Sequence, residues 1–243
     1  MSVFGPAIEI EGKAFDVKGL LFDTLKVEII AGQWTCLLGP SGVGKSTLLR
    51  VLAGLDTHVT FEGTITASDH LDVASRVSYM AQSDLLLPWA TISENISLGA
   101  KLRGTAADQA KKAQIIEQVG LQDHQDKYPS ELSGGQRQRA ALARTLMEDT
   151  PIVLLDEPFS ALDAKTKFQM QELVAETLKG RTILLVTHDP GEAVRLCSQI
   201  YILNSHDLHV APSLQPPFPK DYRDEAVFSL QNELLAQIRG NEQ

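Results

Sequence analysis

The sequence predicts an α/β fold with a mixed, mostly parallel sheet, an antiparallel β part at the N-terminus and an inserted helical subdomain. Two observations lead to this class. The segments 152–155 (IVLL) and 182–186 (TILLV) are apolar throughout, which is typical of parallel strands that helices cover on both faces. Before them, residues 83–146 carry a mostly helical pattern. The length fits one domain over residues 1–243 that includes this insert.

The first elements are expected to be strands followed by one helix. Residues 7–10 and 24–30 have the pattern of antiparallel strands, and 62–66 is a further strand candidate. The run 33–39 (QWTCLLG) predicts a buried strand. Residues 45–53 (KSTLLRVLA) have the apolar spacing of a helix, so a glycine-rich turn must join it to that strand.

The middle of the chain changes from strand to helix. Residues 76–81 (RVSYMA) predict the next core strand. Helices are expected over 106–119, where Gly120 provides a stop, and over 136–146. These helices form the inserted subdomain.

The last third returns to strands and ends in a tail. After 182–186 a strand is expected over 200–203. Four prolines within 211–220 predict an extended linker. Residues 225–239 place apolar side chains at helical spacing, so the tail at 211–243 is expected to be a linker followed by an amphipathic helix.

Composition excludes several classes of protein. The formal net charge of −9 argues against a protein that binds nucleic acid through a broad basic face. No apolar run approaches the roughly 18 residues that a membrane-spanning helix needs. The two cysteines, Cys36 and Cys197, lie in apolar stretches, which predicts buried side chains and not a disulfide or a metal site.

The turn between the strand at 33–39 and the helix at 45–53 has the composition of a phosphate-binding loop, G-x-x-x-x-G-K-[ST]. Its members are Gly39, Pro40, Ser41, Gly42, Val43, Gly44, Lys45, Ser46 and Thr47. Glycines let backbone N–H groups converge on phosphates, and the helix N-terminus adds a positive dipole end. Lys45 would reach the β- and γ-phosphates, and the Ser46 hydroxyl would bind Mg²⁺.

Two carboxylates follow the apolar strand at 152–155. Asp156 and Glu157 stand at the carboxyl end of that strand, where doubly wound sheets bind their ligands. Asp156 would hold the shell of the Mg²⁺ ion, and Glu157 would face the attacking water as general base. An Asp-Glu pair alone is common in solvated turns, but this pair ends a buried strand in a chain with a phosphate loop.

A second glycine-rich turn, Leu132–Gln136, opens the helix expected at 136–146 and is physically a second phosphate nest. It has no lysine and no further magnesium ligand. One turn that holds nucleotide and another that can only cap it suggest that the two act across a dimer interface. The alternative is a plain Gly-Gly loop before an alanine-rich helix.

Two further polar side chains follow strands directly. His188 comes after TILLVT and could meet a γ-phosphate and its water, although a place in a helix cap is the plainer interpretation. Gln82 ends the strand RVSYMA, where its amide could serve a metal or a water and where the helical insert begins. Gln82 is therefore a candidate hinge.

Over about residues 7–240, the chain resembles the ATP-binding subunit of ABC transporters, because it carries the motifs of that subunit in the same order. The resemblance rests on GPSGVGKST at 39–47, Gln82, LSGGQRQR at 132–139, IVLLDEP at 152–158, SALD at 160–163 and His188. It implies a P-loop NTPase core and a head-to-tail homodimer that encloses two ATP and two Mg²⁺.

Individual residues carry over from this resemblance. Ser133, Gly135 and Gln136 resemble the signature that caps the ATP held by the opposite subunit. Asp163 resembles a contact across the dimer, and His188 resembles the switch histidine.

The resemblance also implies an aromatic side chain that stacks on adenine. Phe15 aligns best with it, and Phe22 is the alternative. A phenylalanine keeps the stacking face of the tyrosine usual in the family but lacks its hydroxyl.

Partners follow from the same resemblance. The chain would work at the cytoplasmic side of the cell membrane with integral membrane permease subunits and a solute-binding protein. Asp84–Trp89 (DLLLPW) is an apolar strip of the kind that marks partner surfaces, and it lies where such a permease docks. Packing inside the helical insert is the alternative for this strip.

Gln82 and the following SDLLLPWATISENISLG are similar to the branch that imports nitrate, sulfonates, taurine and pyrimidine precursors of thiamine. The expected function is ATP hydrolysis coupled to import of such a solute. Two alternatives stay open: a soluble ABC ATPase of the iron–sulfur assembly type, and the ATPase subunit of an exporter or lipid extractor.

Overall fold

The computed structural model describes residues 4–16, 19–55, 58–204 and 208–240. The chain divides into two compact units. The first comprises Met1–Tyr79, Thr150–Glu157 and Lys179–Gln243, and the second comprises Met80–Asp149 and Pro158–Leu178.

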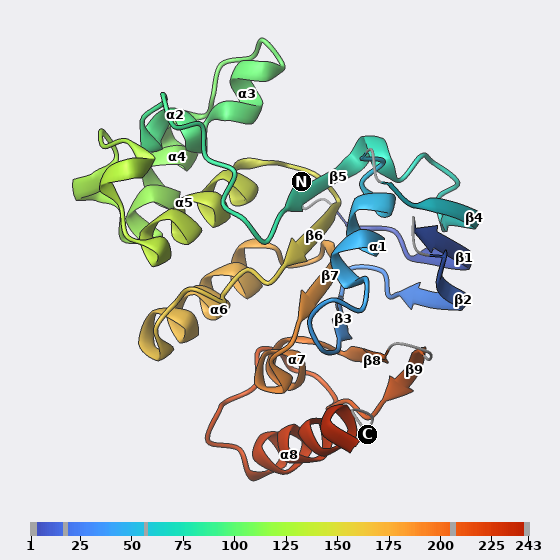
Figure 1. Cartoon of the computed structure of the whole chain (residues 1–243). Coiled ribbons are helices and arrows are strands. Elements are labelled where there is room, and N and C mark those ends of the chain that lie inside the picture. Colours follow the sequence, from blue (N-terminus) through green and yellow to red (C-terminus); the bar gives the residue numbers. More distant parts are fainter. Residues whose placement is uncertain (1–3, 17–18, 56–57, 205–207, 241–243) are drawn as a thin grey trace. The chain divides into compact units, whose positions relative to one another are not determined.

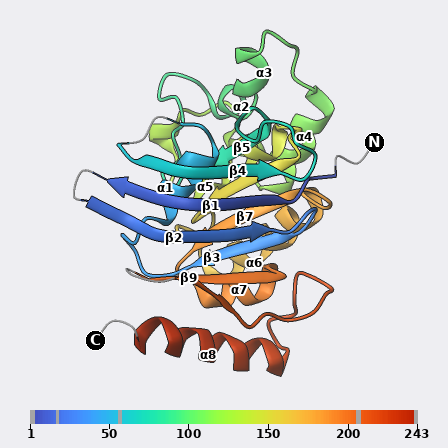
Figure 2. The same cartoon turned by 90° about the vertical axis from the view of Figure 1, so that its right-hand side faces the viewer.

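A three-stranded antiparallel sheet in the order β2-β1-β4 forms one part of the first unit (Figure 2). Its strands are β1 (Ile8–Asp16), β2 (Gly19–Ile29) and β4 (Thr60–Ala67). Ile8 lies opposite Ile29 on one side and opposite Ala67 on the other. The expected antiparallel pairing of the first two strands is confirmed, and both are longer than their apolar patterns indicated.

The other sheet of this unit has six strands in the order β5-β6-β7-β3-β8-β9. They are β3 (Trp34–Leu38), β5 (Val77–Met80), β6 (Ile152–Asp156), β7 (Thr182–Thr187), β8 (Gln199–Leu203) and β9 (Leu208–Ala211). The pairs β6–β7, β7–β3 and β3–β8 are parallel, and β9 pairs antiparallel with β8. Strands β3, β6 and β7 are buried along their whole length, as expected of covered parallel strands.

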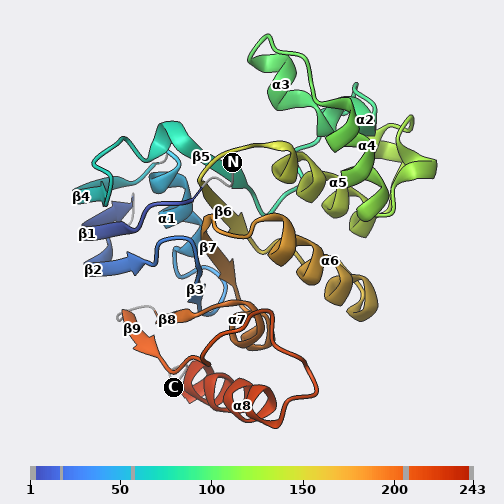
Figure 3. The same cartoon turned by 180° about the vertical axis from the view of Figure 1, so that it is seen from behind.

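The α-helices in the described part of the first unit are α1 (Lys45–Leu52), α7 (Pro190–Leu196) and α8 (Glu225–Gly240). Leu48, Leu49 and Leu52 of α1 join a core cluster that also holds Ile152 and Leu154 of β6. Helix α8 lies beside α7 (Figure 3). The tail helix was expected, whereas β9 was not.

The second unit is helical. Its helices are α2 (Ile92–Ile96), α3 (Leu98–Leu102), α4 (Gln109–Gln118), α5 (Gly134–Met147) and α6 (Ala164–Thr177). Short 3₁₀ turns lie at η1 (Ala74–Arg76, in the first unit), η2 (Gln122–His124) and η3 (Pro129–Glu131). Helix α5 packs against α2, α3 and α4, and α4 runs beside it in Figure 1. Its buried Ala140, Ala141 and Ala143 are small enough for close packing of these helices.

Helix α4 begins later than expected. The side chain of Asp108 accepts a hydrogen bond from the backbone N–H of Lys111 and so fixes the first turn. Helix α6 was not expected at all. Both cysteines are buried and free, as predicted. Among the described residues, no helix is long and apolar enough to cross a membrane.

Candidate functional site

The predicted phosphate loop joins β3 to α1, and its backbone demands glycine at several points. Gly42 has φ 86° and Gly44 has φ 98°, both in the left-handed region that favours glycine. A Cβ atom on Gly39 would lie 2.1 Å from the backbone oxygen of Leu203. Nothing lies within 4 Å of where a Cβ on Gly42 would stand, so the loop is open there. The sequence therefore folds into a tight turn with an accessible backbone at Gly42.

Lys45 holds its ammonium group inside this loop. The side chain is buried, and Nζ donates hydrogen bonds to the carbonyl oxygens of Gly39 at 2.8 Å and Pro40 at 2.6 Å. Burial lowers the pKa of Lys45, while the carboxylates of Glu157 and Asp156 oppose that shift. A positive charge thus stands at the N-terminus of α1.

Next to Lys45, the side chains of Ser46 and Asp156 contact each other. The Ser46 hydroxyl donates to Asp156 Oδ1 at 2.9 Å, although the two residues come from α1 and from the end of β6. Burial raises the pKa of Asp156, and the hydrogen bond from Ser46 opposes that shift. A hydroxyl and a carboxylate this close are the hard oxygen donors that suit Mg²⁺. The residues present fit that ion.

Tyr79 of β5 also contacts Asp156, and sequence reasoning missed it. Its hydroxyl donates to Asp156 Oδ2 at 3.4 Å, and its side chain interacts with Arg50 as well. Both carboxylate oxygens of Asp156 are therefore held by hydroxyl groups. The sequence carried no signal for this contact, because Tyr79 and Asp156 are 77 positions apart and only the sheet places β5 beside β6.

Glu157 and His188 are brought together by the parallel pairing of β6 and β7. Glu157 Oε1 lies 3.1 Å from Nδ1 of His188. The Glu157 backbone has φ 48°, a strained value for a residue with a side chain, and its N–H donates to the Val186 oxygen at 2.9 Å. Glu157 is buried, whereas the His188 side chain is half exposed.

The turn that carries His188 is fixed by buried groups that the sequence did not reveal. The Thr187 hydroxyl donates to Glu192 Oε2 at 2.6 Å and accepts from the N–H of Asp189 at 3.0 Å. Both Thr187 and Glu192 are buried. A threonine that ends a strand and a glutamate on the next helix were the available signals.

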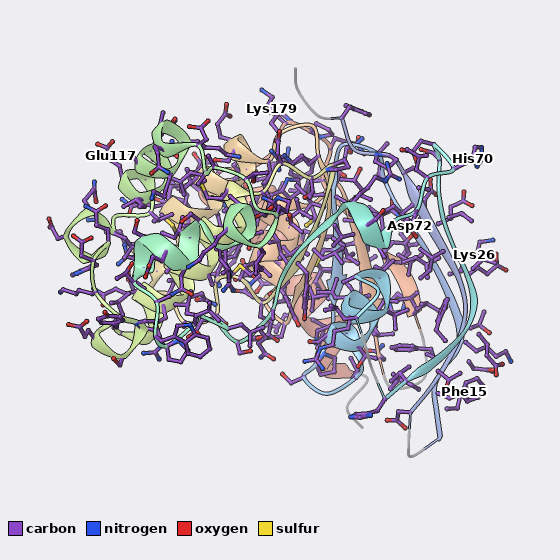
Figure 4. The ribbon with its side chains drawn as sticks, turned by 90° about the horizontal axis from the view of Figure 1, so that it is seen from above. Phe15, Lys26, His70, Asp72, Glu117 and Lys179 are labelled. Carbon is purple, nitrogen blue, oxygen red and sulfur yellow. The ribbon has the colours of Figure 1, made fainter. Side chains whose placement is uncertain are left out.

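Phe15 and Phe22 have different surroundings. Phe22 belongs to the buried core, and a Cβ on Gly44 would lie 2.7 Å from its Cζ. Phe15 is half-buried near the end of β1, the central strand of the three-stranded sheet (Figure 4). Phe22 therefore packs from the core against the phosphate loop at Gly44.

The signature residues lie in the second unit, at the start of α5. Ser133 caps the helix: its Oγ accepts from the N–H of Gln136 at 3.3 Å, and Gln136 Oε1 accepts from the N–H of Ser133 at 2.8 Å. A Cβ on Gly135 would stand 3.1 Å from the Ala161 oxygen, whereas the nearest atom to one on Gly134 would be Nη2 of the Arg137 side chain, at 4.0 Å. The first turn of α5 therefore exposes its backbone next to Gly134.

Gln138 was not predicted, yet it ties this helix to the following SALD segment. Its Nε2 donates to Ser160 Oγ at 3.2 Å, and its Oε1 accepts from the N–H of Ala161 at 2.8 Å.

Two other predicted residues, Asp163 and Gln82, also lie in the second unit. Asp163 caps helix α6, and the hydrogen bond from Thr166 is the largest of the interactions that lower the pKa of Asp163. Gln82 is exposed.

The apolar strip Asp84–Trp89 divides into buried and exposed leucines. Leu86 is only 8% exposed and packs as core, whereas Leu85 is 61% and Trp89 73% exposed. Asp84 accepts from Arg137 Nε at 3.0 Å, and Arg144 donates to the backbone oxygens of Asp84 and Leu85 at 2.7 and 2.8 Å. The segment is thus fixed to α5 with two large apolar side chains on its surface.

A family model described as "ABC transporter" matches residues 22–160, more than half of the chain. The chain belongs to the ABC transporter family. An uncharacterized ABC transporter ATP-binding protein of Haemophilus influenzae is 41% identical, over 91% of this chain and 94% of that protein. The aliphatic sulfonates import ATP-binding protein SsuB 2 of Streptomyces avermitilis is 39% identical, over 96% of this chain and 91% of that protein.

Among solved structures, an ATP-binding cassette in a dimeric post-hydrolysis state with ADP and Pi matches with a TM-score of 0.73 and 26% identity, over 85% of this chain and 100% of that one. The P-loop NTPase fold expected from the sequence is confirmed. This ABC protein binds ATP, has ATPase activity and is the ATPase subunit of a transporter.

Proposed function

We propose that this ABC ATPase drives the import of a small organic anion of the sulfonate type. The observation that carries the proposal is the group of relatives named as aliphatic sulfonate import ATP-binding proteins, at 37–40% identity and over 90% or more of this chain. The segment after Gln82 resembles the same importer branch, which also includes nitrate, taurine and thiamine-precursor importers.

Nucleotide binding is assigned to the phosphate loop. Its open backbone at Gly42 and the N-terminus of α1 would receive the phosphates. The Lys45 ammonium, now hydrogen-bonded to loop carbonyls, would exchange these for the β- and γ-phosphate oxygens. Because Phe22 is buried in the core, Phe15 is the better candidate for stacking on adenine.

Ser46 and Asp156 would hold Mg²⁺, which supplies charge neutralisation for the phosphates when bound. Asp156 is already oriented by hydroxyls on both oxygens, so little reorganisation is needed. Gln82, the third predicted metal ligand, stays a prediction.

Glu157 is the proposed general base. Its carboxylate would take a proton from water as the water oxygen attacks the γ-phosphorus, while the bond to the bridging oxygen of ADP breaks. His188, 3.1 Å from that carboxylate, would orient it and face the γ-phosphate. The buried Thr187 and Glu192 fix the turn on which His188 stands.

The active form would be a homodimer. The signature of one copy, Ser133, Gly135 and Gln136, would cap the ATP held by the phosphate loop of the other, and Asp163 would contact across the interface. The open backbone beside Gly134 supports this role, since a phosphate can approach it closely. A solved relative that is dimeric with ADP and Pi is consistent with it.

Leu85 and Trp89 would be the contact with an integral membrane permease, with a solute-binding protein delivering the solute. In that assembly the chain would sit peripherally at the cytoplasmic face of the membrane.

Growth of the native host tests the function. A deletion strain should fail to grow with an alkanesulfonate as sole sulfur source but grow on sulfate, and plasmid-borne wild-type chain, but not Glu157→Gln, should restore growth. Normal growth of the deletion strain on alkanesulfonates, taurine, nitrate and thiamine precursors would refute import of this class. Loss of iron–sulfur enzyme activity instead would favour the assembly-type alternative.

A further inference from the structure

His124 in the short turn η2 makes an unexpected contact with the signature segment. Its Nε2 lies 2.8 Å from the Nε2 atom of the Gln136 side chain. The other ring nitrogen, Nδ1, is buried and has no hydrogen-bond partner in the described part of the chain. A buried polar atom without a partner costs free energy, so its presence asks for an explanation beyond packing.

The hydrogen bonds around Gln136 decide which atom donates. Gln136 Oε1 accepts from the N–H of Ser133 at 2.8 Å, so the side-chain nitrogen of Gln136 points toward His124. An amide nitrogen only donates, and therefore Nε2 of His124 must be the acceptor. The ring is then neutral with its proton on the buried Nδ1.

This arrangement fixes the amide of Gln136 in one orientation. If the amide turned over, its nitrogen would face the Ser133 N–H, and the reciprocal cap at the start of α5 would be lost. The Ser133 N–H, which only donates, excludes that orientation, and the acceptor on His124 pairs the amide nitrogen in the orientation that remains. The same first turn carries Gly134 with its open backbone.

We propose that His124 is a positioning residue for the signature, holding Gln136 and the Ser133 cap in the geometry that receives the phosphates of the partner copy's ATP. The inference rests on the proposed role of the signature across the homodimer. His124 itself touches no nucleotide. It acts by keeping the first turn of α5 preformed, which lowers the ordering cost of dimer closure.

The variants separate acceptor chemistry from ring volume. His124→Leu removes the acceptor, while His124→Gln offers a carboxamide oxygen near the position of Nε2. Gln122→Leu is the matched control, because Gln122 is exposed in the same turn. Each change is made in the full chain on the Glu157→Gln background, in which hydrolysis is expected to stall.

Three measurements are made on each variant. Sedimentation with Mg²⁺ and ATP gives the dimer dissociation constant, a fluorescent ATP analogue gives the nucleotide affinity of the dilute monomer, and thermal melting gives stability. We expect His124→Leu to weaken dimerisation roughly five- to tenfold, the loss of about one hydrogen bond. His124→Gln and Gln122→Leu should dimerise like the parent, and nucleotide affinity should not change.

The melting temperature distinguishes positioning from a merely structural role. His124→Leu removes the buried donor without a partner together with the acceptor of the Gln136 amide, and these two changes oppose each other in the free energy of unfolding. The melting temperature should therefore stay close to that of the parent while dimerisation weakens, whereas a merely structural histidine would lower the melting temperature and leave dimerisation unchanged. Unchanged dimerisation of His124→Leu, or failure of His124→Gln to restore it, would overturn the inference. If the Glu157→Gln parent itself does not dimerise with ATP, that result refutes the proposed homodimer. It is thereby distinguished from a failure of His124→Leu alone, which refutes the role of His124.

Discussion

Aspartate substitutions at Leu85 and Leu86 separate a partner surface from the core of the second unit. The two leucines are adjacent in sequence, but Leu85 is 61% exposed and Leu86 only 8%. The same chemical change should therefore have opposite consequences for folding and for membrane association.

At Leu86 the cost falls on stability. Burial of a leucine contributes about 1.5–3 kcal/mol, and a carboxylate without a partner in the same place adds a penalty of similar or larger size. We expect Leu86→Asp to lower the free energy of unfolding by roughly 4 kcal/mol, a large share of the stability of an ordinary domain.

At Leu85 the fold should tolerate the change. The backbone there has φ 46°, a region that aspartate enters more readily than leucine, so the free energy of unfolding should stay within about 0.5 kcal/mol. Covering the exposed 61% of this side chain in a complex is worth roughly 1–2 kcal/mol, which corresponds to a five- to thirtyfold loss of affinity for the permease.

Tagged variants expressed in the native host give the test. The measured quantities are the share of the chain in the membrane fraction, the ATPase rate of the purified chain and the urea midpoint of unfolding. Leu102→Asp is the control, since Leu102 is 78% exposed elsewhere in the second unit. Wild-type membrane association of Leu85→Asp would refute the docking surface, and unfolding of that variant would refute its assignment as a surface residue.

Three further predictions concern the nucleotide site. Glu157→Gln should keep ATP affinity but lower phosphate release at least about 100-fold, and a wild-type rate would remove Glu157 as the base. Lys45→Ala should weaken nucleotide binding about tenfold or more in a fluorescence titration, because it removes the charged donor of the loop; unchanged affinity would contradict that role. Tyr79→Phe should raise the Mg²⁺ concentration for half-maximal nucleotide binding roughly tenfold, because Asp156 loses one of its two hydroxyl contacts. Its affinity for metal-free ATP should match the wild type, and a loss there instead would mean general damage to the site.

The features that sequence could predict are those governed by local rules. The phosphate loop needs glycine at positive φ before a helix, and Gly42 and Gly44 supply it within one short segment. The buried parallel strands reveal themselves by continuous apolar runs, as at Ile152–Asp156. Asp156 and Glu157 follow directly from that strand, so their place at its end could be foreseen.

The features that sequence missed depend on partners far away in the chain. Tyr79 matters because it meets a carboxylate 77 positions away, and nothing in its own strand indicates that contact. Leu85 and Leu86 look alike in sequence, and only the packing distinguishes them. Helix α6 lacks a strong apolar stripe and starts at the Asp163 cap, a signal that is common in turns as well.

Helix α5 connects the elements of the second unit that the proposed mechanism uses. Arg137 and Arg144 hold the segment at Asp84, and Gln138 holds the backbone at Ala161. Arg137 and Gln138 lie within one turn of the signature that opens the same helix, and Arg144 lies just over two turns beyond it. Because each contact is a hydrogen bond to one shared helix, a displacement of Asp84–Trp89 cannot be absorbed without moving α5 or breaking these bonds. In the proposed assembly, a permease that pulls on this segment would therefore move the signature and the segment at Ala161 together, which is what the proposed coupling of transport to dimer closure requires.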